Sequence, residues 1–150
     1  MQERPTLKIV KNDPGVCLPA YASEGASGMD ICAFLASELV IPPLGRARVP
    51  TGLRLEIPGG FEAQIRPRSG LAANYGITVL NSPGTIDSDY RGDLEIILVN
   101  LGEKDFIVKN GDRIAQMVVA PVSHAILLES DTICETKRGA GGFGSTGIQH

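Results

Sequence analysis

Short runs of β-branched and aliphatic residues recur along the chain, and turns rich in Pro and Gly separate them. Examples of these turns are Pro42-Pro43-Leu44-Gly45, Pro58-Gly59-Gly60 and Asn110-Gly111-Asp112. Strand signals at this regular spacing indicate an all-β sandwich or barrel. Long amphipathic helices are missing from the pattern. The predicted strands are residues 7–10, 39–41, 46–49, 53–57, 61–65, 77–80, 94–99, 106–108, 114–119 and 125–128.

The composition fits one globular domain of ordinary size. With 150 residues, 43% of them hydrophobic, the chain has enough apolar material for a core. It carries 14 Lys plus Arg against 17 Asp plus Glu, a net charge of −3. This balance argues against a diffuse nucleic-acid-binding surface, although a few local arginines can still hold a small anionic ligand.

Neither a membrane span nor a secretory leader is expected, so we predict a soluble, cytoplasmic protein. The start, Met1-Gln2-Glu3-Arg4-Pro5, is charged, and no later run has the length of a membrane span. Cys17, Cys32 and Cys134 are odd in number and widely scattered, which indicates neither a disulfide framework nor a metal site. We expect reduced thiols that are packed into the fold.

A polar segment bounded by glycines, residues 84–96, joins the predicted strands 77–80 and 94–99 as a hairpin. Strands on both sides would hold it still, and loops on a rigid scaffold often carry binding and catalytic groups. Asp87 and Asp89, with Tyr90 beside them, place acceptor oxygens and a ring there. A turn rich in Asp and Gly, simply because turns favour these residues, explains the segment equally well.

One short helix is predicted, with Ser69 as its N-cap and Gly76 as its C-terminal stop. It follows Arg66-Pro67-Arg68, so free backbone N–H groups, a hydroxyl and guanidinium groups come together, as they do in an anion site. From these residues alone, a capped connector helix with solvated arginines is the simpler interpretation.

Polar residues also interrupt two apolar strands. Asp30 follows Gly28 at the start of one strand, where an acid is usually only a turn residue. Arg113 and Gln116 interrupt another. Gln116 either faces solvent or serves a site, and periodicity does not choose between them.

The segment from Lys137 to Gly147 combines five glycines with Arg138, Phe143 and two hydroxyl residues. Glycines let backbone N–H groups converge on phosphate oxygens, and Phe143 offers a flat face for a base. A flexible terminal tail is the alternative. The isolated Phe favours a functional role. Neither a P-loop nor a dinucleotide-binding fingerprint is present.

Together these stretches resemble the five motifs of the trimeric dUTPase family, which hydrolyses dUTP to dUMP and pyrophosphate. The resemblance implies a jelly-roll-type β-barrel with one short helix, residues 1–136, and a mobile Gly-rich lid, residues 137–150. Met29 and Ile31 stand where the family often has an aromatic residue and Leu. The motifs occur in family order: Ser27-Gly28-Met29-Asp30-Ile31, Arg66-Pro67-Arg68-Ser69-Gly70-Leu71-Ala72, Gly84-Thr85-Ile86-Asp87 to Tyr90-Arg91-Gly92, Gly111-Asp112-Arg113-Ile114-Ala115-Gln116, and Arg138-Gly139 to Gly147.

The resemblance further implies a homotrimer with sites shared between subunits, which keeps uracil out of DNA and supplies dUMP for thymidylate synthesis. Asp87 would be the catalytic carboxylate that deprotonates a water for in-line attack on the α-phosphorus. Mg²⁺ would bind the substrate phosphates, with Asp30 holding the metal's waters. No metal site built from protein ligands alone is expected.

The same resemblance implies which residues bind the substrate. Asn81 and backbone groups of the hairpin, among them those of Thr85, Ile86 and Glu95, would read uracil, and Tyr90 would lie against the deoxyribose. The α- and β-phosphates would be held by Ser69, Gly70 and Gln116, while Arg68 and Arg113 serve phosphates or brace the site. In the tail, Phe143 would cover the uracil, and the γ-phosphate would be clamped by Arg138, Ser145 and Thr146, with Gly144 also in contact with the substrate.

Two other functions compete with this one. A dCTP deaminase shares the fold and a related nucleotide site, but it needs a Glu base near the cytosine and has a C-terminal tail of different sequence. A dUTP-binding trimer that acts as a sensor is the second alternative, although Asp87, Ser69 and Gln116 are all present for turnover.

Overall fold

A computed structural model describes residues 4–149. Within them it has eleven strands and one short helix, in the order β1 (Lys8–Lys11), β2 (Ala20–Tyr21), β3 (Met29–Cys32), β4 (Leu39–Ile41), β5 (Arg46–Glu56), β6 (Phe61–Arg66), α1 (Ser69–Tyr75), β7 (Ile77–Val79), β8 (Gly84–Ile86), β9 (Asp93–Asn100), β10 (Phe106–Val108) and β11 (Arg113–Pro121).

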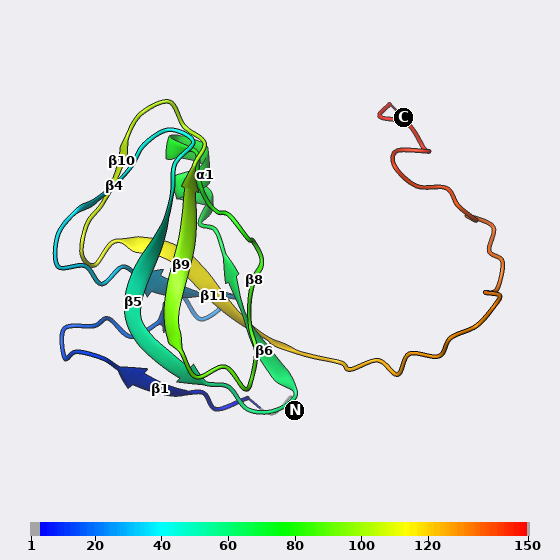
Figure 1. Cartoon of the computed structure of the whole chain (residues 1–150), viewed down its shortest axis with the longest axis horizontal. Helices are drawn as coiled ribbons and strands as arrows, with labels where there is room; N and C mark the ends of the chain where they lie inside the picture. Colours follow the sequence, from blue (N-terminus) through cyan, green and yellow to red (C-terminus); the bar gives the residue numbers. More distant parts are fainter. Residues whose placement is uncertain (1–3, 150) are drawn as a thin grey trace.

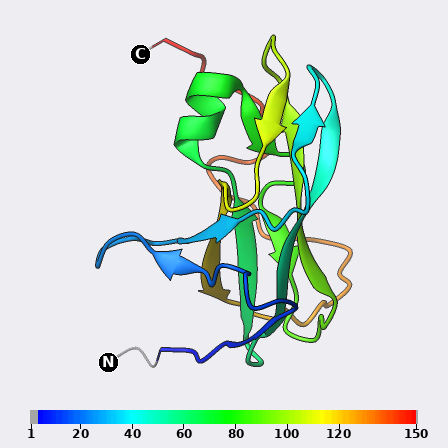
Figure 2. The ribbon, with the colours of Figure 1, turned by 90° about the vertical axis from the view of Figure 1, so that its left-hand side faces the viewer.

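The strands form two main antiparallel sheets that enclose one core (Figure 1). One sheet has the order β1-β5-β9-β7, the other β2-β3-β11-β6-β8, and β10 pairs with β4 in a small third sheet. Figure 2 shows α1 at the end of the barrel where β4 and β10 also lie. This architecture confirms the predicted all-β, jelly-roll-type fold.

The core arises from strands that alternate buried and exposed side chains, as a half-buried sheet requires. In β9, for example, Leu94, Ile96 and Leu98 are buried while the residues between them are partly exposed. Met117 and Ile31 meet them from the second sheet, each with 0% of its surface exposed. Burying each such side chain contributes about 1.5–3 kcal/mol, so these positions fix which face of each strand points inward.

Two of the strand predictions are wrong in more than their end points. Residues 46–49 and 53–56 belong to a single strand, β5, which ends one residue before the predicted end and whose register with β9 shifts between Pro50 and Leu53. Gly52 lies in this bulge with φ of 70°, and a Cβ there would stand 2.4 Å from the Val16 side chain. Residues 125–128 form no strand at all. The chain beyond β11 runs away from the barrel (Figure 1), and Ile126 is 97% exposed.

The hairpin segment differs from the prediction in one respect. β7 and β9 pair antiparallel, as predicted, but the chain between them crosses to the other sheet as β8 and pairs with β6. The loop after β8 is therefore anchored by both sheets.

The helix and the cysteines bring two more corrections. Arg68, not Ser69, is the N-cap of α1, and it makes no side-chain capping bond, whereas Gly76 ends the helix in the left-handed region as predicted. All three thiols are free, but Cys17 and Cys134 are exposed, so the expectation that they are packed was wrong. Within residues 4–149, no helix has the length and apolar character needed to cross a membrane.

Candidate active site

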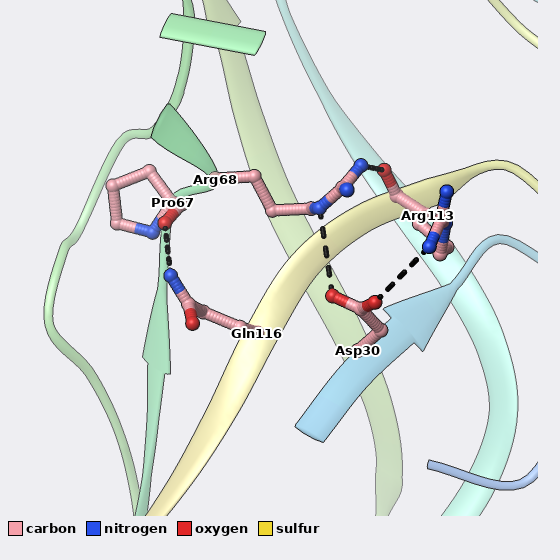
Figure 3. Close-up of polar contacts among 5 residues, drawn as sticks. All are labelled: Asp30, Pro67, Arg68, Arg113 and Gln116. Carbon is pink, nitrogen blue, oxygen red and sulfur yellow. Dashed lines mark hydrogen bonds and ion pairs between the residues drawn. The ribbon is translucent and has the colours of Figure 1, made fainter. Parts of the chain in front are cut away.

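Asp30 lies between two arginines that come from different elements (Figure 3). Its carboxylate is 3.5 Å from Nε of Arg68, which precedes α1, and 3.4 Å from Nη1 of Arg113 on β11. The Arg68 Nη1 also donates to the Arg113 carbonyl at 2.9 Å. We call these three residues the arginine cluster. One carboxylate facing two guanidinium groups leaves an excess of positive charge, which suits an anionic ligand.

Strand register brings Gln116 to the same place. Gln116 on β11 lies opposite Asp30 on β3 and opposite Arg66 on β6. Its side-chain amide donates to the Pro67 carbonyl at 3.0 Å (Figure 3). A Cβ on Gly28 would lie 2.8 Å from the Gln116 Oε1, so a glycine is needed at position 28 to leave this side chain its place.

The start of α1 adds backbone donors beside the arginine cluster. The first helical bond runs from the Ala72 N–H to the Arg68 carbonyl, at 3.1 Å. The N–H groups of Ser69, Gly70 and Leu71 precede it and have no partner within the helix. Ser69 and Gly70 are exposed, so their amides and the Ser69 hydroxyl are open to a ligand.

A second group of predicted residues lines a pocket of about 420 Å³ between β8 and β9. The predicted site residues in its wall are Thr85, Ile86, Asp87, Tyr90 and Glu95. We call this the hairpin pocket.

Local hydrogen bonds hold the loop of the hairpin pocket in shape. The Tyr90 hydroxyl donates to the Asp93 carbonyl at 2.9 Å, and the Arg91 guanidinium donates to the Ser88 carbonyl at 2.7 Å. A Cβ on Gly92 would stand 2.4 Å from the Tyr90 hydroxyl oxygen. Gly92 therefore permits the Tyr90 ring to fold back over the loop.

The backbone of Glu95 forms an open edge beside this pocket. Glu95 lies opposite Pro50, whose carbonyl turns away from β9 and accepts from the Phe34 N–H at 2.8 Å. The Ile97 carbonyl points toward β7, because it accepts from the Leu80 N–H at 2.9 Å. Backbone groups of successive residues point to opposite sides of a strand, so those of Glu95, two residues before Ile97, also point toward the β7 side. β7 has ended by this point, so one donor and one acceptor at Glu95 face an edge that no strand covers.

Asn81 lies in the exposed loop that follows β7. Its Nδ2 is 3.3 Å from the place where a Cβ on Gly84 would stand, so glycine lets this amide lie against the start of β8.

The predicted tail residues lie together but away from both groups. They line one pocket of their own, whose wall includes Arg138, Phe143, Gly144, Ser145 and Thr146. The Arg138 Nε donates to the Gly141 carbonyl at 2.8 Å, and the Phe143 ring is fully exposed. Figure 1 shows this segment at the far end of the extended chain, clear of the barrel.

One chain does not bring the hairpin pocket and the arginine cluster together. Gln116 lies opposite Arg66 on β6, whereas Ile86 lies opposite Ala63, which places Asp87 level with Glu62. Four residues along β6 and two strand spacings across the sheet amount to about 16 Å. A carboxylate that acts on a phosphate group must approach it far more closely.

The carboxylates of the chain do not fit a directly bound metal ion. Among residues 4–149, no group of three or more His, Cys, Asp or Glu side chains could hold one. Both oxygens of Asp30 already face guanidinium groups. A single carboxylate does fit an outer contact, through water, to a cation such as Mg²⁺ that keeps several of its waters.

Cys32 is two residues from Asp30 but contributes no nucleophile. Burial raises the pKa of its thiol, and the neighbouring Cys17 and Asp30 raise it further, while Arg113 acts in the opposite direction. The thiol therefore stays protonated at neutral pH.

The family model described as dUTPase matches residues 16–147. This chain belongs to the dUTPase family. It is 56% identical to the deoxyuridine 5'-triphosphate nucleotidohydrolase of Rhizobium etli (strain CIAT 652) over 151 residues. The alignment covers 98% of this chain and 97% of the relative. The corresponding protein of Neorickettsia sennetsu (strain ATCC VR-367 / Miyayama) is 50% identical, over 99% of this chain and 100% of the relative.

Among solved structures, the Staphylococcus bacteriophage 80alpha dUTPase with dUPNHPP has a similar fold. Its TM-score is 0.83 at 25% identity, over 95% of this chain and 99% of that chain. The family prediction made from the five motifs is thus confirmed. In this chain the motif residues occupy three separate places, namely the arginine cluster with α1, the hairpin pocket, and the tail.

Arg48 is a pocket residue that the sequence did not reveal. It lies on β5, outside all five motifs, yet its side chain lines the hairpin pocket with Asp87. The sequence offered only a charged residue on the outward face of a strand, which is ordinary. Only the pairing of β5 with β9 shows what it faces.

Proposed function

We propose that this chain is a dUTP diphosphatase that hydrolyses dUTP to dUMP and pyrophosphate, at sites shared between the subunits of a homotrimer. Membership of the dUTPase family is the observation that carries the proposal. Such an enzyme acts on the nucleotide pool, which places it in the cytoplasm, where it keeps uracil out of DNA and supplies dUMP for thymidylate synthesis.

The hairpin pocket selects the base and the sugar. Uracil offers a donor flanked by acceptors, and the free N–H and C=O of Glu95 supply the complementary pair, together with the Asn81 amide and the backbone of Thr85 and Ile86. Cytosine has a donor at C4 and an acceptor at N3, where uracil has an acceptor and a donor. It would therefore leave the backbone N–H and C=O of Glu95 unpaired. Tyr90, folded back onto its own loop, lies against the deoxyribose and leaves no room for a 2′-hydroxyl.

Asp87 carries the chemistry. Its carboxylate takes a proton from a water as the water oxygen bonds to the α-phosphorus, and the bond to the bridging oxygen breaks to release pyrophosphate. A carboxylate is a weak base at neutral pH, so positioning and charge neutralisation supply much of the rate.

The arginine cluster and the start of α1 hold the α- and β-phosphates. Ser69, Gly70 and Gln116 donate to phosphate oxygens, and Arg68 with Arg113 supply the positive field. Asp30 would hold Mg²⁺ through water, and the ion would supply positive charge that offsets the charge of the substrate phosphates.

The separation of these parts within one chain supports a site that is shared between subunits. Asp87 and Gln116 of one chain are about 16 Å apart along the sheet, so Asp87 serves a phosphate site on a neighbouring subunit. The apolar side chains of Ile126, Leu127 and Leu128, each at least 90% exposed, support the same conclusion, because they need a partner surface.

The tail closes the site of a third subunit as a mobile lid, residues 137–150, of which His150 lies outside the described residues. Arg138, Ser145 and Thr146 clamp the γ-phosphate, and Phe143 stacks on the uracil, with Gly144 beside it. Closure excludes water and commits the substrate.

Parallel assays with dUTP, dCTP, dTTP and UTP test the proposal, each with Mg²⁺ and then with a chelator. Pyrophosphate release from dUTP alone, lost on chelation, is the expected result. Ammonia from dCTP would indicate the deaminase, and binding of dUTP without turnover would indicate the sensor. A sedimentation mass other than three chains would contradict the trimer.

A further inference from the structure

An ion pair fixes the side chain of Glu95 from a neighbouring strand. The Nε of Arg48 on β5 donates to the Glu95 Oε2 at 2.6 Å, and its Nη2 contacts the same oxygen. The Glu95 side chain is 31% exposed. Both residues lie in the wall of the hairpin pocket, with Asp87 and Tyr90. The pair is therefore part of the pocket rather than of a remote surface.

The sheet itself gives β9 little support at this point. On the β5 side the register shifts between Pro50 and Leu53, and the Pro50 carbonyl, opposite Glu95, points away from β9 and accepts from the Phe34 N–H. The Leu94 carbonyl accepts instead from the Thr51 hydroxyl, at 2.7 Å. On the other side β7 has already ended. The Arg48 side chain thus connects β5 to β9 at a point where the regular backbone hydrogen bonds of β9 are interrupted on both sides.

The pair also decides the charge of the pocket. Without Arg48, the Glu95 carboxylate would stand unpaired in a pocket that already contains Asp87 and Asp93. A third uncompensated negative charge would repel a nucleoside triphosphate before any specific contact forms.

We propose that Arg48 is a positioning residue for base selection. Through Glu95 it holds the free backbone N–H and C=O of β9 where they meet the pyrimidine, and it cancels a charge that opposes substrate entry. The inference rests on the proposed function. It extends that function to a side chain that lies outside the five motifs.

The test compares steady-state kinetics of Arg48→Met with those of the intact protein, using dUTP and dCTP. Base contacts are made equally in the ground state and the transition state, so their loss raises KM and leaves kcat within about twofold. We expect KM for dUTP to rise roughly three- to tenfold, the effect of weakening one or two neutral hydrogen bonds. The preference for dUTP over dCTP should fall by a similar factor.

Lys8→Met is the matched control. Lys8 pairs with Glu56 of β5 at 2.9 Å in the same sheet, but neither residue lines the hairpin pocket. This variant should keep the KM and the base preference of the intact protein. Glu95→Gln removes the pair from its other end and should reproduce the KM of Arg48→Met in part, because it also removes the repelling charge. The double exchange R48E/E95R should restore both the KM for dUTP and the preference for dUTP over dCTP.

Three results would overturn the inference: an unchanged KM and preference in Arg48→Met, an equal change in Lys8→Met, or no recovery in R48E/E95R. If Arg48→Met folds poorly, the comparison of Glu95→Gln with R48E/E95R decides by the same quantities. An intact protein that fails to hydrolyse dUTP would refute the proposed function, and Kd values for dUTP would then test Arg48 separately.

Discussion

A single methyl group at Gly28 should impair the phosphate site while leaving the barrel intact. In Gly28→Ala the new Cβ would lie 2.8 Å from the Gln116 Oε1, 3.3 Å from its Cβ and 3.4 Å from the Val118 Cγ2. The closest contact is the far end of a flexible side chain, so Gln116 rotates away and loses its 3.0 Å bond to the Pro67 carbonyl. One neutral hydrogen bond contributes about 0.5–1.5 kcal/mol, so kcat/KM for dUTP should fall about two- to twelvefold.

Thermal unfolding should separate this effect from damage to the fold. A loss of about 1 kcal/mol in unfolding free energy lowers the midpoint by about 2–4 °C in a chain of this size, and the shift in Gly28→Ala should not exceed that. Gly25→Ala is the control, because a Cβ at Gly25 meets nothing within 4 Å in the same loop. Unchanged kcat/KM in Gly28→Ala, or an equal loss in Gly25→Ala, would refute the argument that Gln116 is placed by the absence of a side chain at Gly28.

Three further predictions concern the base, the tail and pH. Asp87→Asn should still bind dUTP but lose about 10²- to 10⁴-fold in turnover, because the amide cannot take a proton; near-full activity would dismiss Asp87 as the base. Deletion from Gly139 onward should depress turnover and leave the trimer assembled, so a monomer would show that the tail is mainly structural. The hydrogen bond from Lys8 holds the pKa of Glu56 below its ordinary value of 4.5, so this pair stabilises the fold above that pH and the gain is lost as the pH falls. The thermal midpoint of Lys8→Met should therefore depend less on pH between about 5 and 3 than that of the intact protein; equal slopes would contradict this.

The fold could be predicted because its information is local. Alternating burial in β9 and the turn residues around Gly59 and Gly111 determine strands and their ends without reference to the rest of the chain. The errors occur where distant parts decide. In the sequence, Gly52 indicates a break between two strands. In the structure it lies in a bulge within one strand, where the Val16 side chain leaves no room for a Cβ. The apolar run 125–128 reads as a strand, but the single chain offers it no partner.

The residues of the candidate site could be proposed from the sequence, but their arrangement in space could not. Asp30, Arg68, Arg113 and Gln116 meet because β3, β6 and β11 are neighbours, which no spacing in the sequence reveals. Arg48 was missed for the same reason, since only its position opposite β9 distinguishes it from other surface arginines.

Subunit complementation tests the central claim most directly. Asp87→Asn lacks the proposed base, and Ser69→Ala/Gln116→Leu lacks two of the groups proposed to hold the phosphates, so each variant alone should be nearly inactive. If the two parts of a site come from different chains, trimers refolded from an equal mixture should recover activity at about a quarter of their sites. If both parts come from the same chain, the mixture should stay as inactive as the separate variants, and that result would contradict the shared site.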